Sequence, residues 1–201
     1  MLEGLKRTIG WALQPIRPGV QAFASRRADF ADVPDTIRVT SPAFENGGQI
    51  PASYTADGEG RFPPINWTDV PAGARSLVLL VEDADSPSLR PLVHAILTGI
   101  PPEIGGLPEG AIPPSLRTSR ADGSKPGRNS VGRPGWMAIA PPPGHGPHRY
   151  AFQIFALNAA PTFDWAPGRE HLLKVIRPHV IARGTLVGIY QRKGADAGSG
   201  S

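Results

Sequence analysis

The sequence predicts a mainly β protein, an antiparallel β-sandwich with a C-terminal helix and a short amphipathic helix at the N-terminus. Glycine and proline each occur 24 times in 201 residues, which favours short strands joined by many turns over a helix bundle. From Thr36 onward, short apolar or alternating runs recur between turn-forming residues. Too few helical stretches separate these runs to provide the crossovers of a parallel α/β sheet.

The first 35 residues differ in pattern from the rest of the chain. Four apolar side chains share one side of a helical wheel and Pro15 ends the pattern, so residues 2–14 are predicted to form an amphipathic helix. These side chains are Leu2, Leu5, Ile9 and Leu13. So short a helix is marginal alone, so it is expected to pack on its own domain or on the second subunit of a homodimer rather than on a membrane. Residues 15–35 are predicted to be a tether.

Residues 36–191 are predicted to form one domain, followed by a disordered tail at residues 192–201. The candidate strands are residues 36–40, 76–82, 91–98, 149–157 and 185–191. Residues 169–182 have the pattern of one helix that Pro178 kinks and Gly184 caps.

The composition excludes several classes of site. The chain has no cysteine, which excludes disulfides, a thiol nucleophile and cysteine-ligated metal centres. Its net charge of +4 and its pI near 9.8 favour anionic partners without naming one. The longest apolar runs, such as residues 77–81, are too short to span a bilayer, and the first residues lack the pattern of a signal peptide. A cytoplasmic protein without a transmembrane segment is therefore expected.

Two histidine-containing segments are the candidate functional elements. The first is Val81–Pro87 followed by His94, and the second is Pro141–Tyr150. Each segment places a histidine on a predicted strand beside a turn rich in polar residues or proline. Two such segments from distant parts of the chain predict one converged pocket, in which imidazoles beside a carboxylate and a phenol suit a small anion.

Strand geometry assigns roles to the individual side chains. A hairpin between the two strands of the first segment would place Asp83 opposite His94, where the carboxylate would orient the imidazole and raise its pKa. Alternation along the second segment puts His148 and Tyr150 on one face and Arg149 on the other. Both histidines and the phenol are then expected to donate hydrogen bonds to the anion, with Arg149 as a structural ion-pair partner beneath the site.

The order of these motifs resembles the phosphatidylethanolamine-binding protein family and is most similar to its bacterial branch, called Raf-kinase-inhibitor-like. The segments that carry the resemblance are Ser41–Phe44, Pro63–Trp67, Asp83–Pro87, His94, Pro141–Pro142, His148–Tyr150 and His179–Tyr190. The resemblance extends over about residues 36–191. The Asp-x-Asp-x-Pro and His-Arg-Tyr signatures are specific in combination, although neither is specific alone.

The resemblance implies a β-sandwich with a small cavity for anions such as phosphate, acetate or a phospholipid head group, and phosphate or phosphorylethanolamine is the expected partner. The residues that it implies for the anion site are Asp83, Asp85, Pro87, His94, His148 and Tyr150. It implies no cofactor and no obligatory metal, although His145 lies three residues before His148 and makes a metal site conceivable. The chain departs from the family pattern at Ala84, Ala95 and Ala138–Ile139, and the last change is expected to alter the shape of the cavity.

Several functions stay open at this point. The favoured one is non-enzymatic binding of a small anion. The second is regulation of a protein partner, such as a kinase or a protease. The third is a small hydrolase that uses a histidine–carboxylate pair as general base, for which no nucleophile or oxyanion hole is evident. The basic loop 113–135 lacks interleaved aromatic residues, so it is predicted as a solvated loop or an anion-steering rim rather than a nucleic-acid site.

Overall fold

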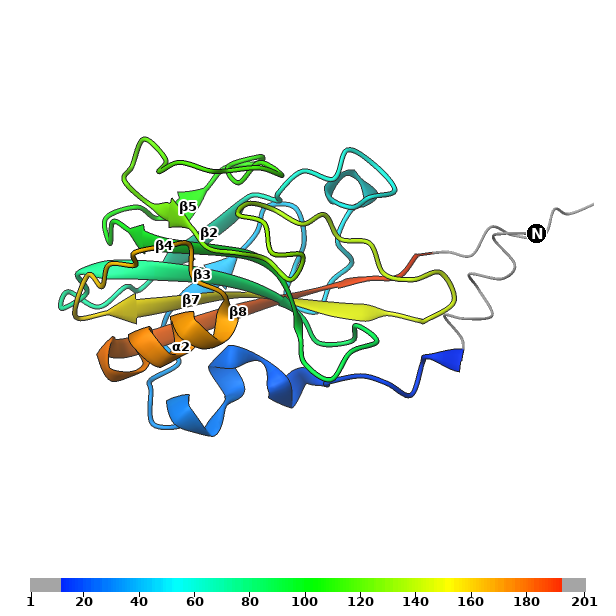
Figure 1. Ribbon diagram of the computed structural model, residues 1–201, viewed down its shortest axis with the longest axis horizontal. Helices are drawn as coiled ribbons and strands as arrows, with labels where there is room; N and C mark the ends of the chain where they lie inside the picture. Colours follow the sequence, from blue (N-terminus) through cyan, green and yellow to red (C-terminus); the bar gives the residue numbers. More distant parts are fainter. Residues whose placement is uncertain (1–11, 193–201) are drawn as a thin grey trace, which may run out of the picture.

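The computed structural model describes residues 12–192 and contains two antiparallel β-sheets (Figure 1). The larger sheet has the strand order β6-β4-β3-β7-β8, and the smaller sheet has the order β1-β2-β5. The strands are β1 (Arg38–Thr40), β2 (Ile65–Thr68), β3 (Ser76–Asp83), β4 (Leu92–Ile100), β5 (Gly106–Leu107), β6 (Lys125–Pro126), β7 (His148–Leu157) and β8 (Val180–Tyr190). The predicted mainly β fold is confirmed.

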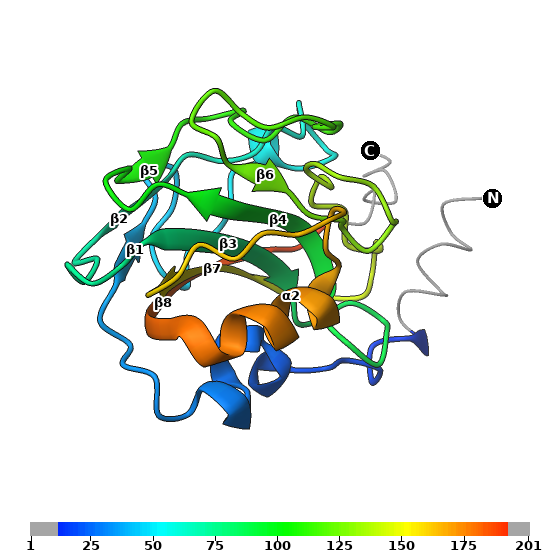
Figure 2. The same ribbon diagram turned by 60° about the vertical axis from the view of Figure 1, so that its left-hand side comes forward.

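The central strands β3 and β7 are buried because both faces of the larger sheet are covered. On one face, Leu77 and Val81 of β3 pack into the core that the smaller sheet shares. On the opposite face, Val78 and Leu80 pack against helix α2 (Arg169–Ile176). Figure 2 shows α2 and the smaller sheet on opposite sides of the larger sheet. This three-layer arrangement explains why β3 reads as a continuous apolar run rather than an alternating one.

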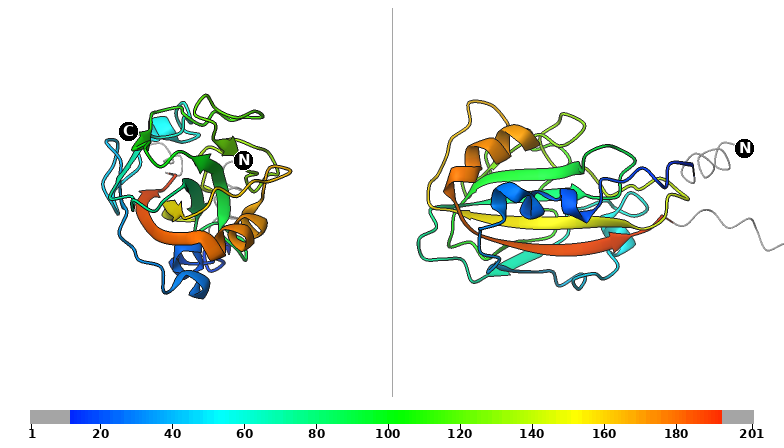
Figure 3. Two further views of the ribbon diagram at one scale, coloured as in Figure 1. Left: turned by 90° about the vertical axis from the view of Figure 1, so that its left-hand side faces the viewer. Right: turned by 90° about the horizontal axis from the view of Figure 1, so that it is seen from below.

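The N-terminal segment covers the same face of the larger sheet as α2 (Figure 3). It forms three short 3-10 helices, η1 (Val20–Ala22), η2 (Ala24–Arg26) and η3 (Ala28–Phe30). The side chains of Phe23 and Phe30 are fully buried. Residues 15–35 therefore pack on the domain and do not form the predicted tether. Two isolated aromatic anchors give no periodic pattern, which is why the sequence did not predict this packing.

The chain after α2 differs from the predicted helix over residues 169–182. The helix ends at Ile176, a 3-10 turn η5 covers Arg177–His179, and β8 follows directly. Gly184 consequently lies inside a strand and is not a helix cap. A Cβ atom at Gly184 would lie 1.9 Å from the carbonyl oxygen of Ile37, so close backbone approach explains the glycine. Pairing along the whole length of β7 overrides the local helical pattern of the residues that begin β8.

Three strands of the structure were not predicted. Strand β2 alternates buried and exposed residues, but it is only four residues long and follows Pro63–Pro64. Strand β6 contains a proline, and β5 and β6 have only two residues each, too few to show a pattern. A 3-10 helix η4 (Ala52–Tyr54) lies between β1 and β2. Pairing with a neighbouring strand holds each of β2, β5 and β6 extended.

The ends of the chain are described only in part. Of the predicted helix 2–14, Ala12 is helical and the next three residues form a turn, while residues 2–11 lie outside the described residues. Residues 193–201 of the predicted tail also lie outside them. Between residues 12 and 192, no helix has the length and apolar character needed to cross a bilayer.

Candidate functional site

A cavity of about 270 Å³ lies where the two histidine-containing segments meet. Strands β3 and β7 pair with Asp83 directly opposite Tyr150, and His148 lies two residues away on the same face. The cavity is lined by Asp83, Ser86, Pro87, Leu92, His94, Met137, Ala138, Ala140, Pro141, Pro142 and His148. Two segments that are far apart in the sequence therefore contribute to one cavity, as the sequence predicts.

A β-bulge directs His94 into this cavity. The register between β3 and β4 shifts by one residue between Val81 and Glu82, so that His94 is an extra residue on β4. Asp83 is paired with Leu92 and not with His94, which corrects the predicted hairpin register. The prediction was wrong because it assumed a regular ladder between the two strands. The Asp83 carboxylate is consequently available to a different histidine.

His94 presents an unprotonated ring nitrogen at the cavity. Its Nδ1 lies 2.7 Å from the carbonyl oxygen of Met137, which only accepts, so Nδ1 carries the proton. Its Nε2 is buried and has no hydrogen-bond partner among residues 12–192. Burial lowers the pKa of His94, and the nearby carboxylate of Asp83 offsets this only in part. The predicted rise in this pKa is therefore wrong, because desolvation outweighs the carboxylate.

Tyr150 lies next to His94 and is not among the residues that line the cavity. Its ring is fully buried and meets the His94 ring edge-to-face, with 5.2 Å between the ring centroids. The hydroxyl has no partner with normal hydrogen-bond geometry in the described part of the chain. Burial, followed by the charge of the nearby Asp83 carboxylate and its weak hydrogen bonding to the hydroxyl, raises the pKa of Tyr150 well above its usual value of 10.0. The phenol is therefore protonated at neutral pH and has a hydrogen-bond donor to offer.

Asp83 orients His148 as the first link in a chain of three hydrogen bonds. Oδ2 of Asp83 lies 2.8 Å from Nδ1 of His148, whose Nε2 lies 2.8 Å from Nδ1 of His145. Nε2 of His145 lies 2.9 Å from the carbonyl oxygen of Leu13. The chain thus runs from β3 through β7 and the preceding loop to the N-terminal segment.

These hydrogen bonds fix the number of protons on the two imidazoles. The ionised carboxylate of Asp83 and the carbonyl of Leu13 only accept, so each requires a ring N–H. The hydrogen bond between His148 Nε2 and His145 Nδ1 requires one more proton. The three hydrogen bonds thus need three ring protons, whereas two neutral imidazoles carry only two. With Asp83 ionised, the pair carries one positive charge, and the direct hydrogen bond between His148 and the carboxylate places that charge beside Asp83. Burial lowers the pKa of His145.

The chain changes the expected role of His148. Both of its ring nitrogens are bonded within the protein, so it has no N–H left to donate to a ligand, in contrast to the predicted donor role. It contributes the charge of its imidazolium to the cavity wall instead. The same bonds occupy the nitrogens that a metal ion at His145 and His148 would need. The predicted donors were His94, His148 and Tyr150. Among them, only the Tyr150 hydroxyl has a hydrogen to donate to a ligand, since the unbonded Nε2 of His94 is an acceptor.

Asp85 lies behind the cavity and is not part of its lining. Its buried carboxylate accepts hydrogen bonds from the backbone N, Nε and Nη2 of Arg149 at 2.9, 2.7 and 2.6 Å. Arg17 forms a further ion pair with it at 3.2 Å. Burial opposes ionisation of Asp85, but the hydrogen bonds from Arg149 outweigh it and lower its pKa. The structural ion pair predicted for Arg149 is confirmed, and Asp85 serves that pair rather than contacting the cavity.

Residues 13–17 form a strap across the loop that carries His145. The Gln14 amide donates to the carbonyl of Gly144 at 2.8 Å. The Arg17 guanidinium donates to the carbonyl of Pro147 at 2.8 Å and to that of His145. Together with the Leu13 carbonyl, these contacts tie the N-terminal segment to the back of the cavity. Sequence reasoning missed the strap, because bonds to main-chain carbonyls leave no side-chain signature.

The departures from the family pattern have local explanations. Ala138 lines the cavity, whereas Ile139 is buried in the main core and forms a bridge with Thr55, so this pair leaves the cavity open. The backbone N–H of Ala84 donates to the carbonyl of Arg149 at 3.0 Å. A proline at that position has no N–H and would lose this bond. Alanine is therefore the better fit beside this ion pair.

We expect acid to destabilise the fold through His94. Its pKa in the folded state is below the ordinary value of 6.5, so in acid the unfolded chain binds a proton that the folded protein excludes. Above about pH 6.5, His94 is neutral in both states and does not change the free energy of unfolding with pH. Between that pH and the folded-state pKa, the free energy of unfolding falls by up to about 1.4 kcal/mol for each unit of pH decrease. Urea unfolding between about pH 7 and pH 5 should show a flatter pH dependence for His94→Phe than for the wild type. Equal slopes would contradict the buried neutral imidazole.

Comparisons with known proteins agree with the motifs and the fold. The family model described as Phosphatidylethanolamine-binding protein matches residues 40–191. A UPF0098 protein from Methanothermobacter thermautotrophicus is 37% identical over 156 residues, which cover 78% of this chain and 99% of that protein. A UPF0098 protein from Pyrococcus abyssi is 38% identical over 161 residues, which cover 79% of this chain and 87% of that protein. The strap, residues 13–17, precedes the range that the family model matches.

Solved structures agree as well. A phosphatidylethanolamine-binding protein homologue from Chlamydia trachomatis has a TM-score of 0.69 and 33% identity, and the match covers 79% of this chain and 99% of that one. YbcL from E. coli, described as a new member of the mammalian PEBP family, has a TM-score of 0.69 and 26% identity with the same coverage. With the family model matched over residues 40–191, the chain belongs to the phosphatidylethanolamine-binding protein family.

Proposed function

We propose that this protein binds a small anion without catalysing a reaction, and that the anion is the phosphate of a head group such as phosphorylethanolamine. One observation carries the proposal: Nε2 of His94, which lines the cavity, and the hydroxyl of the adjacent Tyr150 are both buried without partners among residues 12–192. Buried polar atoms in folded proteins are almost always hydrogen-bonded. Two such atoms on adjacent rings, one of them at the cavity wall, therefore support a ligand that completes their hydrogen bonds.

The chemistry of the two atoms favours a ligand with both an acceptor and a donor oxygen. The Tyr150 hydroxyl donates, so it requires an anionic or carbonyl oxygen. Nε2 of His94 is unprotonated, so it requires an O–H. A monoprotonated phosphate group supplies both, because its second pKa is about 6 and one P–O–H persists near neutral pH. The pair thus suits a phosphate monoester better than a fully ionised carboxylate.

The charges around the cavity also favour an anion. His148, Arg149 and Arg17 are positive, and Asp83 and Asp85 are negative, so three positive groups face two negative ones. Arg17 of the strap provides the excess. Since Arg149 and Arg17 lie behind the cavity on Asp85, they act through charge rather than through direct contact.

The size and lining of the cavity suit a small ligand. Its volume of about 270 Å³ lies just below the range of roughly 300–1,000 Å³ that is common for drug-sized ligands. Apolar side chains dominate the lining, which also contains Asp83, Ser86, His94 and His148. We therefore infer that the phosphate enters first and that the rest of the head group contacts the prolines Pro87, Pro141 and Pro142.

The hydrogen bonds favour binding over hydrolysis. A histidine that acts as general base is oriented by a third group, commonly a carboxylate. Here the carboxylate of Asp83 holds His148, whose nitrogens are both bonded, and the free nitrogen of His94 is backed by a peptide carbonyl. Turnover of ester or phosphoester substrates that is lost in His94→Phe would contradict the non-enzymatic part of the proposal.

Removing the hydroxyl of Tyr150 should weaken ligand binding without lowering the stability of the unliganded protein. Tyr150→Phe should weaken phosphorylethanolamine binding by roughly 10- to 100-fold, because one hydrogen bond to a charged ligand is lost. The unliganded protein should be as stable as the wild type or more so, because a buried unpartnered hydroxyl is removed. Calorimetric titration and urea unfolding measure the two effects.

Tyr54→Phe is the matched control, since the Tyr54 hydroxyl bonds Glu109 at the exposed surface, 3.0 Å away. This variant should bind phosphorylethanolamine like the wild type. Equal affinity for Tyr150→Phe and Tyr54→Phe would overturn the assignment of the phenol to the anion site. A loss of stability in Tyr150→Phe would contradict the unpartnered hydroxyl.

A further inference from the structure

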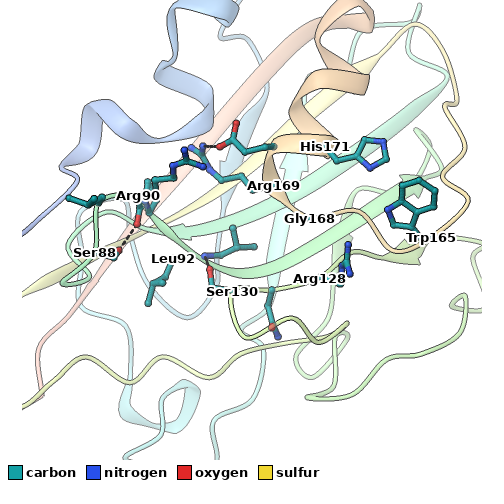
Figure 4. Close-up of a pocket in the computed structure, with 14 residues that line it drawn as sticks. Ser88, Arg90, Leu92, Arg128, Ser130, Trp165, Gly168, Arg169 and His171 are labelled. Carbon is teal, nitrogen blue, oxygen red and sulfur yellow. Dashed lines mark hydrogen bonds and ion pairs between the residues drawn. The ribbon is translucent and has the colours of Figure 1, made fainter.

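A second cavity of about 680 Å³ lies between the start of β4, the loop at residues 128–130 and the first turn of α2. We call it the arginine groove, after Arg90 and Arg128 (Figure 4). Leu92 lines both this groove and the anion cavity, but His94 and His148 do not line the groove. The groove is therefore a separate site on the molecule.

The groove carries positive charge that the described residues do not neutralise. The side chains of Arg90 and Arg128 are exposed and form no ion pair or hydrogen bond with any residue from 12 to 192. Arg169 also lines the groove but is paired with Glu82 and Glu170. Glu170 is the acidic residue in the lining of the groove. It already forms ion pairs with Arg169 at 2.7 Å and with Arg27 at 3.3 Å. Two guanidinium groups are thus left to attract negative charge.

The two free arginines lie apart along the groove. Figure 4 shows Arg90 near Arg169 at one end, and Arg128 near Trp165 at the other, with Gly168 between them. A single small anion engages one of these ends. A ligand that satisfies both must carry separated negative charges, as an extended peptide with acidic residues does on alternate positions.

The middle of the groove offers main-chain donors. Helix α2 begins there after Gly168, and no side chain caps its N-terminus. The first amides of a helix point away from it unbonded and attract carbonyl or carboxylate oxygens. They lie between the two free arginines, where a peptide spanning the groove would present such oxygens.

The end near Arg128 is aromatic. Trp165 is 58% exposed, and its ring centroid lies 5.4 Å from that of His171. Phe163 meets the His171 ring in a T-shaped contact, with 5.8 Å between the ring centroids. These aromatic contacts hold an indole at the surface, where it can cover an apolar side chain of a bound peptide.

We propose that the arginine groove binds an extended acidic peptide segment of a partner protein, with its carboxylates on Arg90 and Arg128 and an apolar side chain on Trp165. The charge complementarity and the separation of the two arginines carry this assignment. It does not depend on the anion cavity, because the two sites use different polar groups. The protein thereby has a surface for a protein partner in addition to its small-ligand site.

The test uses the full chain and a fluorescently labelled extended peptide with glutamate, glutamate and phenylalanine at every second position and serine between them, so that all three side chains share one face. Fluorescence anisotropy should show saturable binding that weakens with salt, and Arg90→Gln/Arg128→Gln should weaken it about tenfold. The control Arg38→Gln/Arg75→Gln removes the same charge from two exposed arginines outside the groove and should change binding less than about twofold. Trp165→Ser should weaken binding of this peptide but not of one with serine in place of phenylalanine.

Several results would overturn the proposal. If the two double variants lost the same amount of peptide affinity, the binding would depend on the net charge of the protein and not on the groove. Displacement of the peptide by phosphate at constant ionic strength, together with loss of binding in Tyr150→Phe, would move it to the anion cavity. Absence of saturable binding by the wild type at low salt would remove the site altogether.

Discussion

Replacing Arg169 with methionine should lower the free energy of unfolding by about 3–5 kcal/mol, because it leaves a buried carboxylate without its cation. Glu82 is fully buried, and its carboxylate accepts hydrogen bonds from Arg169, from Gln153 and from the backbone N–H of Ala24. Arg169 also donates to the carbonyl of Ala22 at 2.8 Å. This network joins β3, β7, α2 and the N-terminal segment, so its loss should loosen all four. Urea unfolding measures the effect.

Two further variants separate the buried charge from the loss of a long side chain. Glu82→Gln/Arg169→Met removes both charges and should recover part of the lost stability. Arg27→Met breaks exposed pairs with Asp29 and Glu170 and should cost at most about 1 kcal/mol. If Arg169→Met were no more destabilising than Arg27→Met, the buried ion pair would not anchor the N-terminal segment.

The second large effect is expected at Asp83. Asp83→Asn removes the negative charge that balances the additional proton on the His148–His145 pair. The pair should then lose that proton at neutral pH, because an uncompensated buried charge is unfavourable. All three hydrogen bonds of the chain are then kept, because Nδ2 of the asparagine donates to Nδ1 of a neutral His148 while its Oδ1 still accepts from the N–H of Asp85. The large effect therefore falls on protonation, and stability should change by no more than about 1 kcal/mol.

Nitrogen NMR of the imidazole rings measures this protonation directly. In the wild type at pH 7, both ring nitrogens of His148 should have the shifts of protonated nitrogens, while His94 should have one protonated and one unprotonated nitrogen. Asp83→Asn should return one nitrogen of His148 to the unprotonated shift. The control Asp29→Asn, at an exposed carboxylate, should change neither histidine. A neutral His148 in the wild type would contradict the proton count.

The sequence predicted the long apolar strands well, but not the strands that depend on pairing with a distant segment. Strands β3, β4 and β7 are long and apolar, and their predicted ranges differ from the observed ones by at most two residues at either end. Strand β8 was predicted only from residue 185, because its first residues also fit a helix and pairing with β7 decides between the two. Strands β2, β5 and β6 have two to four residues each and are extended only because a neighbour pairs with them.

The sequence predicted which residues meet at the site, but not which hydrogen bonds they form. Alternation correctly put His148 and Tyr150 on one face, because a strand has no other periodicity. The partner of Asp83 depends on the bulge at His94, and a bulge leaves no signature in a single sequence. The proton on His148 depends further on the main-chain carbonyl of Leu13, which any residue type could supply.

Glu82 shows a signal that sequence reasoning passed over. A charged residue next to the apolar run of β3 indicates a buried partner, since carboxylates are almost never buried alone. The partner itself was out of reach, because Arg169 lies 87 positions later in the chain. No local rule connects positions so far apart, and only the packing of α2 on the sheet brings them together.

The most direct measurement of the central claim is a titration of phosphorylethanolamine into the wild type, followed by the ring nitrogens of His94 in NMR. The bound phosphate should give a saturable change at Nε2 of His94, because that nitrogen accepts its O–H. Above about pH 6, the affinity should fall about tenfold per pH unit as the ligand loses the proton that His94 requires. Binding that leaves His94 unchanged, or that strengthens as the pH rises, would contradict the account.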